Sequence, residues 1–173
     1  MPRNVEMVQK GISILHPRLA EYVCLEILHT YGEDAWWQEV KSALSDQLAD
    51  LPVGGEYGAL VDSLDFANCI RLFDRRWNEV FRKKLSKDYR TWANELMGVR
   101  NKVAHIGGAD FDEDYAWRAL DTMSRLCDGL DAPQESEELR SLARELRYGS
   151  AQGSMSAAPV GNAAAKPQPT SDG

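Results

Sequence analysis

The pattern that decides the fold class is clearest in SKDYRTWANELMGVRNKVAHIGG, residues 86–108. Ser86 is a favourable N-cap, and the glycines at 107–108 are expected to stop the helix just after His105. Between them, apolar side chains recur at helical spacing: Trp92, Leu96, Val99 and Val103. The segment therefore predicts one amphipathic helix over residues 87–104.

The same spacing of apolar residues extends to both sides of this segment. Further helices are expected over residues 5–15, 17–31, 36–48 and 62–85, from Asp110 or Asp112 to about Leu130, and over 133–148. Pro17 divides the first two because proline suits the first turn of a helix, and Pro52 with three glycines marks a loop over residues 51–58. With no strand alternation and no internal repeat, the sequence predicts an all-α, compact helical bundle.

One helical domain is expected over residues 1–148. After it the composition changes to Ala, Pro, Gly and Ser with almost no large apolar residue. Such a segment cannot bury enough surface to offset its chain entropy. Residues 149–173 are therefore expected to form a disordered tail, or a linker to a further domain.

Composition excludes several other classes of protein. The apolar fraction of 43% fits a globular domain, while no apolar run approaches a membrane span and no signal peptide is evident. Cys24, Cys69 and Cys127 are far apart and fit no zinc spacing, so we expect them in the core of a cytoplasmic protein. We expect no metal and no cofactor. We also expect no ATP hydrolysis by this chain, since the sequence has no phosphate-binding glycine loop.

Charge is distributed unevenly along the chain. The net charge is −7, yet residues 71–102 include ten basic and four acidic side chains, which makes that stretch +6 and leaves −13 elsewhere. Such a run is either a solvated helix face or a strip that follows the phosphates of RNA. On the second interpretation the RNA contacts are expected from four lysines: Lys83, Lys84, Lys87 and Lys102.

Arg100, Asn101 and His105 form the candidate catalytic group. Arginine stays charged and can hold a phosphate with two hydrogen bonds. Neutral histidine can take a proton near pH 7 from a ribose 2′-hydroxyl, a group that RNA has and DNA lacks. Five residues span about 140° of a regular helix, so Arg100 and His105 share no face, whereas Asn101 and His105 do. Loosening of the helix at His105 would bring the imidazole towards the arginine.

The motif and its surroundings resemble the HEPN superfamily of helical RNases and RNA-binding modules. VRNKVAH at 99–105 is similar to the Arg-Asn-x-x-x-His signature of these domains. Three other segments resemble the branch named after a fungal nuclear RNA-surveillance endonuclease: LDF at 64–66, RWNEVF at 76–81 and DYAWRALDTMSRL at 114–126. The resemblance covers roughly residues 5–132. Members of this branch commonly sit at the front of bacterial ATPases linked to phage defence.

The resemblance implies a metal-independent endoribonuclease that leaves a 2′,3′-cyclic phosphate and acts as a toxin or effector in bacterial phage defence or stress. It assigns His105 as general base, Arg100 to the developing phosphorane charge, and Asn101 to orienting the imidazole or binding phosphate. It also implies a homodimer in which two antiparallel motif helices bring two arginines and two histidines into one cleft. The alternative is a non-catalytic module that dimerises or docks a partner ATPase or another defence protein.

Each candidate residue also has a purely structural interpretation. Asp65 is either a helix N-terminal carboxylate or a second-shell partner that holds Arg100. Arg100 can instead pair with a carboxylate such as Asp65 or Glu95, and His105 can stabilise a helix C-terminus. Five tryptophans are expected in the core and not as platforms for stacked bases: Trp36, Trp37, Trp77, Trp92 and Trp117.

Overall fold

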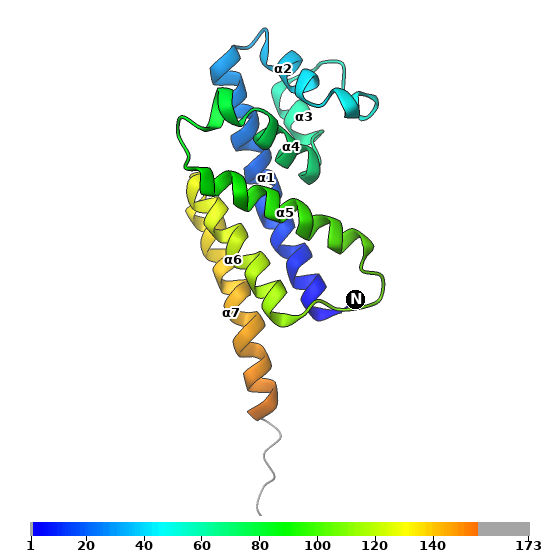
Figure 1. The fold of residues 1–173 in the computed structure, drawn as a ribbon, viewed down its shortest axis with the longest axis vertical. Helices are drawn as coiled ribbons and strands as arrows, with labels where there is room; N and C mark the ends of the chain where they lie inside the picture. The colour runs from blue at the N-terminus through cyan, green and yellow to red at the C-terminus, as the bar shows by residue number, and fades with distance from the viewer. Residues whose placement is uncertain (1, 156–173) are drawn as a thin grey trace, which may run out of the picture.

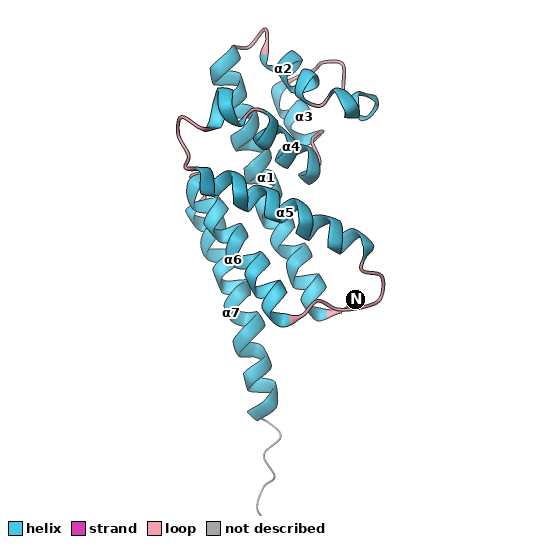
Figure 2. Cartoon of the chain, viewed as in Figure 1, coloured by secondary structure: helices cyan, strands magenta, loops and turns pink. Residues whose placement is uncertain are grey.

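The computed structural model describes residues 2–155, of which 150–155 are described by their backbone only. Its α-helices are α1 (Arg3–Tyr31), α2 (Trp36–Ala43), α3 (Tyr57–Asp62), α4 (Phe66–Arg75), α5 (Lys87–His105), α6 (Glu113–Gly129) and α7 (Pro133–Met155). A 3₁₀ turn, η1 (Ser45–Asp50), and a π-helical turn, η2 (Trp77–Phe81), complete the elements. The described chain consists of helices and connecting loops alone (Figure 2), which confirms the predicted all-α helical bundle.

Helix α1 is the element around which the others are arranged (Figure 1). Helices α6 and α7 pack along its N-terminal part, whereas α2, α3 and α4 gather at its C-terminal end. Helix α5 crosses α1 between these two groups and contacts both α4 and α6. One continuous core joins all of them, and its fully buried side chains include Leu15, Phe73, Leu96 and Leu120.

Helix α1 corrects the prediction that a new helix begins at Pro17. The helix continues from Arg3 to Tyr31 with Pro17 inside it, on the exposed side. A proline within a helix removes one hydrogen bond and costs about 3 kcal/mol. Leu15 and Leu19 on either side are fully buried, and burying such a side chain contributes about 1.5–3 kcal/mol. Packing of one uninterrupted apolar face therefore outweighs the cost of the proline.

The predicted helices over 36–48 and 62–85 are each divided in the structure. The first ends at Ala43 and is followed by η1. The second is broken before α4, where Asp65 accepts a hydrogen bond from the backbone N–H of Asn68 (2.7 Å). An N-cap residue with extended backbone starts a new helix and cannot continue the preceding one. The side chains predicted to be buried in this region are buried: Leu64, Ile70, Phe73, Trp77, Val80 and Phe81.

Helix α7 extends past residue 148, the predicted end of the helical domain. It continues to Met155, and Figure 1 shows its last turns projecting beyond the other helices. The remainder of the segment predicted to be disordered, residues 156–173, lies outside the described residues. Between residues 2 and 155, no helix is both long and apolar enough to cross a membrane.

The three cysteines lie in the core as free thiols, as predicted. Burial raises the pKa of Cys24 and Cys127 to about 12 and places the pKa of Cys69 well above its ordinary value. A thiol that stays protonated at neutral pH is a poor nucleophile and a poor metal ligand. These residues therefore act as small core side chains.

Candidate active site

Helix α5 holds the motif at its C-terminal end. Ala93, Leu96 and Val99 are buried and fix the helix against the bundle. Ser86 occupies the predicted N-cap position, although its hydroxyl makes no capping hydrogen bond within the described chain. Val103, predicted to be buried, is only half-buried. Contact with the bundle therefore weakens toward the end of α5, and the motif residues come closer to solvent.

The helix does not loosen at His105. This residue is still part of α5, and Ile106 keeps right-handed helical backbone angles (φ −70°, ψ −19°). The chain reverses at Gly107, whose φ of 66° lies in the left-handed region that favours glycine. The reversal comes too late to swing the imidazole toward Arg100.

Asp110 ties the loop after the motif to the first turn of α1. Its carboxylate accepts hydrogen bonds from the backbone N–H groups of Asn4 (3.2 Å), Val5 (2.9 Å) and Phe111 (2.9 Å). Burial by itself would raise the pKa of this carboxyl, but the N–H groups outweigh it and hold the pKa below its ordinary value. Of the two acids predicted to cap α6, Asp112 does so, whereas Asp110 caps a helix at the other end of the chain.

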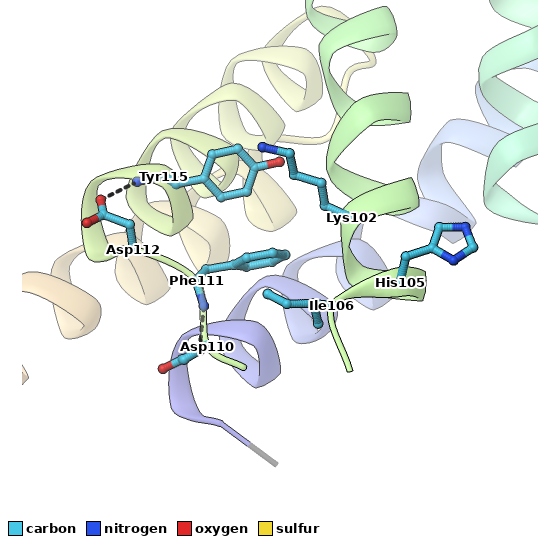
Figure 3. Close-up of a pocket in the computed structure, with 7 residues that line it drawn as sticks. All are labelled: Lys102, His105, Ile106, Asp110, Phe111, Asp112 and Tyr115. Atoms are coloured by element: carbon cyan, nitrogen blue, oxygen red, sulfur yellow. Dashed lines mark hydrogen bonds between the residues drawn. The ribbon is translucent and has the colours of Figure 1, made fainter. Parts of the chain in front are cut away.

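Arg100 and His105 do not meet within one chain. The helix is continuous between them, so they stay about 140° apart around its axis. The Arg100 guanidinium donates from Nη1 to Oδ1 of Asn101 (3.2 Å), an exposed residue. His105 is exposed too, and Figure 3 shows its ring directed away from Phe111 and Tyr115. One copy of the protein thus presents the arginine and the histidine on separate sides of α5.

Neither carboxylate considered as a partner for Arg100 contacts it. Asp65 caps α4, which is the structural interpretation of that residue. Glu95 pairs with Arg118, with an Nε to Oε1 distance of 2.8 Å. Within residues 2–149 the Arg100 side chain makes a single polar contact, its hydrogen bond to Asn101. The guanidinium therefore keeps most of its donors for a phosphate.

Gly98, Asn101 and His105 form a polar face of α5. They are spaced three and four residues apart, so they follow one side of the helix, and all three are exposed. Apart from the neighbouring backbone of α5 itself, a Cβ atom at Gly98 would meet no described atom within 4 Å. The missing side chain leaves room for a second helix to approach this face closely.

A pocket of about 470 Å³ opens beside the end of α5. The last turn of α5, the following loop and the first turn of α6 supply its walls (Figure 3): Lys102, His105, Ile106, Asp110, Phe111, Asp112 and Tyr115. The rings of Phe111 and Tyr115 meet edge to face with centroids 5.0 Å apart, and the Lys102 ammonium lies 4.4 Å from the Tyr115 centroid. Of these residues, the sequence identifies only Lys102 and His105 as site candidates. Its only signal for the rest of the pocket is a pair of aromatic residues, Phe111 and Tyr115, soon after the motif.

The basic stretch 71–102 is divided in the structure. Lys87 is the first residue of α5, about 27 Å along the helix from His105, and Lys83 and Lys84 lie in the turn just before it. Lys102 is the one of the four predicted RNA contacts that lies beside the motif. Ion pairs engage four cations of the stretch: Arg75 with Asp46, Arg76 with Glu39, Lys84 with Glu26 and Arg90 with Asp74.

Trp92 and Trp117 are not core residues, in contrast to the prediction. The other three tryptophans are buried, whereas these two are half-buried. Arg125 lies 5.9 Å from the Trp92 ring centroid, and Arg147 lies 4.2 Å from that of Trp117. Arginine can cover an aromatic face while its charge stays in water, so these rings do not need full burial.

The described chain is an all-α bundle with Arg-Asn-x-x-x-His at the C-terminal end of α5. The family model described as Swt1-like HEPN matches residues 10–131. Because this match spans well over half of the chain, the protein belongs to the Swt1-like HEPN family. HEPN domains are commonly RNases, and membership suggests a nuclease or another RNA-related role. No curated protein and no solved structure matches the chain.

Proposed function

We propose that the protein is a metal-independent endoribonuclease that cuts RNA through attack by the ribose 2′-hydroxyl. The observation that carries this proposal is the exposed C-terminal end of α5. There the imidazole of His105 is open to solvent, and the guanidinium of Arg100 has no carboxylate partner within residues 2–149. Family membership adds the RNA-related role. The described residues contain no group of three or more His, Cys, Asp or Glu side chains placed to hold a metal ion.

In the proposed reaction His105 removes the proton of the 2′-hydroxyl. The 2′-oxygen attacks the adjacent phosphorus, the bond from phosphorus to the 5′-oxygen breaks, and a 2′,3′-cyclic phosphate forms. The leaving 5′-oxygen takes a proton from a second histidine or from water. Arg100 stabilises the negative charge that grows on the phosphorane oxygens. Because Asn101 accepts a hydrogen bond from Arg100, we assign it to positioning the guanidinium.

The proposed active form is a homodimer. Within one copy Arg100 and His105 lie on separate sides of α5, whereas the polar face with Gly98 is exposed and open. Two copies packed antiparallel through this face would set His105 of one copy against the motif of the other. HEPN domains often dimerise, and such pairing would complete a site that one copy leaves open.

The test compares two histidine variants in excess EDTA. His105→Ala is expected to lower the rate of RNA cutting by about 10²–10⁴-fold, the usual contribution of a general base. His29→Ala removes another exposed histidine, in the last turn of α1, and serves as the matched control. Cutting that survives His105→Ala, or that needs a divalent ion, contradicts the proposed mechanism.

The second candidate function is a non-catalytic docking module for a partner ATPase or another defence protein. It is favoured by the separation of Arg100 from His105 in one chain, since a monomer lacks a complete site. A monomer at micromolar concentration that leaves RNA uncut would support this function. For either function we propose a cytoplasmic role in bacterial phage defence or the stress response.

A further inference from the structure

The pocket beside the motif has the composition of a site for a small flat ligand. Its volume is about 470 Å³, and most of its lining surface is apolar, although four of the seven residues that line it are lysine, histidine or aspartate. Small-molecule sites combine these features: an apolar concavity and a few polar groups that fix orientation. The pocket also shares Lys102 and His105 with the motif, so a ligand in it would lie next to the proposed site of cutting.

Phe111 and Tyr115 give the pocket an aromatic wall that the fold holds in place. The Phe111 N–H donates to Oδ1 of Asp110 (2.9 Å), and its carbonyl accepts from Nδ2 of Asn4 (2.8 Å). Its ring packs edge to face against Tyr115. The Lys102 ammonium now lies over the Tyr115 ring, but a cation on a flexible side chain is displaced readily, and a stacked base gains more from such a ring. Because Phe111 is buried and Tyr115 is half-buried, the Tyr115 ring is the part of this wall that can offer a face to a nucleobase.

Two charged side chains of the pocket keep an open hydrogen-bonding group, an acceptor on Asp112 and a donor on Lys102. Both carboxylate oxygens of Asp110 already accept backbone N–H groups. Asp112 uses Oδ1 for the N–H groups of Asp114 and Tyr115, as Figure 3 shows in part, while its Oδ2 has no hydrogen-bond partner among residues 2–149. Lys102 supplies the donor. Two carboxylates on the rim repel a phosphate and favour the N–H groups of a base.

We propose that this pocket binds a guanine base of the RNA, next to the nucleotide that is cut. The inference rests on the proposed nuclease function. Guanine presents two adjacent N–H groups, on N1 and N2, to the free oxygen of Asp112, and its O6 and N7 accept from Lys102. Uracil has a single ring N–H between two carbonyls, which a carboxylate repels. Lys102 and His105 are neighbours on the helix surface, and His105 points out of the pocket (Figure 3), toward the side where the phosphodiester would lie.

Calorimetry of the full chain with 5′-GMP, 5′-IMP and 5′-UMP tests the proposal. IMP lacks only the 2-amino group, so its binding is expected to be about tenfold weaker than that of GMP, and UMP is expected not to bind. Asp112→Asn keeps an N-cap for α6 and should remove the difference between GMP and IMP. Tyr115→Leu keeps apolar bulk without the ring and should abolish GMP binding. Glu113→Gln, an exposed neighbour, is the matched control.

Mapping of the cut positions separates this inference from the function on which it rests. RNA cut beside guanine by the wild type, and without that preference by Asp112→Asn, supports both. Cutting without base preference, together with equal binding of GMP and IMP, overturns the pocket assignment and leaves the nuclease intact. Selective GMP binding by a protein that cuts no RNA overturns the nuclease and leaves a guanine site.

Discussion

Positive charge lies in opposite settings just before α5 and at the C-terminal end of α5. In the turn before α5, Lys84 pairs with Glu26 of α1 (2.8 Å), and the Glu26 side chain is only 13% exposed. At the C-terminal end of α5, the Arg100 side chain hydrogen-bonds a neutral amide and has no ion pair within residues 2–149, and His105 is open to solvent. In sequence both regions belong to one basic stretch. The comparison shows that a count of charges along the chain does not locate a binding surface, because the neutralising acids come from remote elements.

Arg75 shows how firmly some of these charges are committed. Its guanidinium donates to both carboxylate oxygens of Asp46 in η1 (2.7 and 3.2 Å) and to the carbonyl of Ala43 (2.7 Å). The hydrogen bond from Arg75 lowers the pKa of Asp46 to about 2. A phosphate would have to displace this carboxylate, whereas at Arg100 it meets open donors. We therefore expect substitutions at the two ends of the basic stretch to differ in effect.

The largest expected effect is on catalysis at the end of α5. Arg100→Ala should lower the single-turnover rate of RNA cutting by about 10²–10³-fold, since it removes stabilisation of transition-state charge. Arg100→Lys keeps the charge but loses the planar guanidinium, so its rate should lie between those of the wild type and Arg100→Ala. Arg82→Ala, at an exposed arginine without an ion pair in residues 2–149, should leave the rate unchanged. Equal losses at Arg82 and Arg100 would remove the distinction between the two ends.

Assembly gives the next effect. Gly98→Leu adds a side chain that meets nothing in one copy and improves helix propensity by about 1 kcal/mol. The monomer should therefore be at least as stable, while the dimer and RNA cutting should be abolished. Light scattering and thermal unfolding measure the two outcomes. Gly58→Leu, at another open helical glycine in α3, is the matched control. A Gly98→Leu protein that still dimerises shows that another surface joins the copies.

RNA affinity should respond unequally to changes at the C-terminal end of α5 and to changes at its first residue and in the turn before it. Lys102→Glu is expected to weaken binding about tenfold, and reversing Lys83 and Lys87 together only a few-fold, with the salt slope reduced by about 1 for each phosphate that is no longer neutralised. Lys84 is left unchanged because a glutamate there would face Glu26. Fluorescence anisotropy at two salt concentrations decides. Equal effects would indicate one continuous RNA-binding strip from Lys83 to Lys102. A flat salt response would argue against RNA as the ligand.

The smallest effect is on stability through Asp110. Asp110→Ala removes the cap of α1 and should cost about 1 kcal/mol, a fall of about 2–4 °C in Tm for a chain of this size. Because the folded pKa of Asp110 is lowered, its contribution is complete above the unfolded value of about 3.9 and is lost as pH falls through the lower folded value. The gap between wild type and variant should thus be constant from pH 7 to 5 and close below about pH 4. Glu113→Ala, an exposed neighbour, should show no gap.

Local sequence signals predict where helices form in this protein better than they predict whether one helix continues into the next. The limits of α5 follow from Ser86, the apolar spacing and Gly107, all of which act within a few residues. Pro17 gives an equally clear local signal, yet α1 continues through it because the neighbouring leucines are buried by other helices. A local signal is decisive only where tertiary packing does not oppose it.

The candidate site divides in the same way. Arg100, Asn101 and His105 can be found from sequence, because their chemistry and their spacing are local. The pocket beside them cannot, because Phe111 and Tyr115 line it only after Asp110 has tied the loop to the start of α1. The role of Asp65 also needed the structure, which shows it capping α4 and not holding Arg100.

By itself, then, the sequence determined an all-α bundle, most of its buried side chains and the candidate motif of Arg100, Asn101 and His105. These follow from helical periodicity and residue type, which are properties of short segments. Only the tertiary structure decided which cations are neutralised, where the polar face of α5 is exposed and what surrounds His105. Ion pairs, burial and pockets depend on residues that are remote in sequence, and their positions are set by packing around α1.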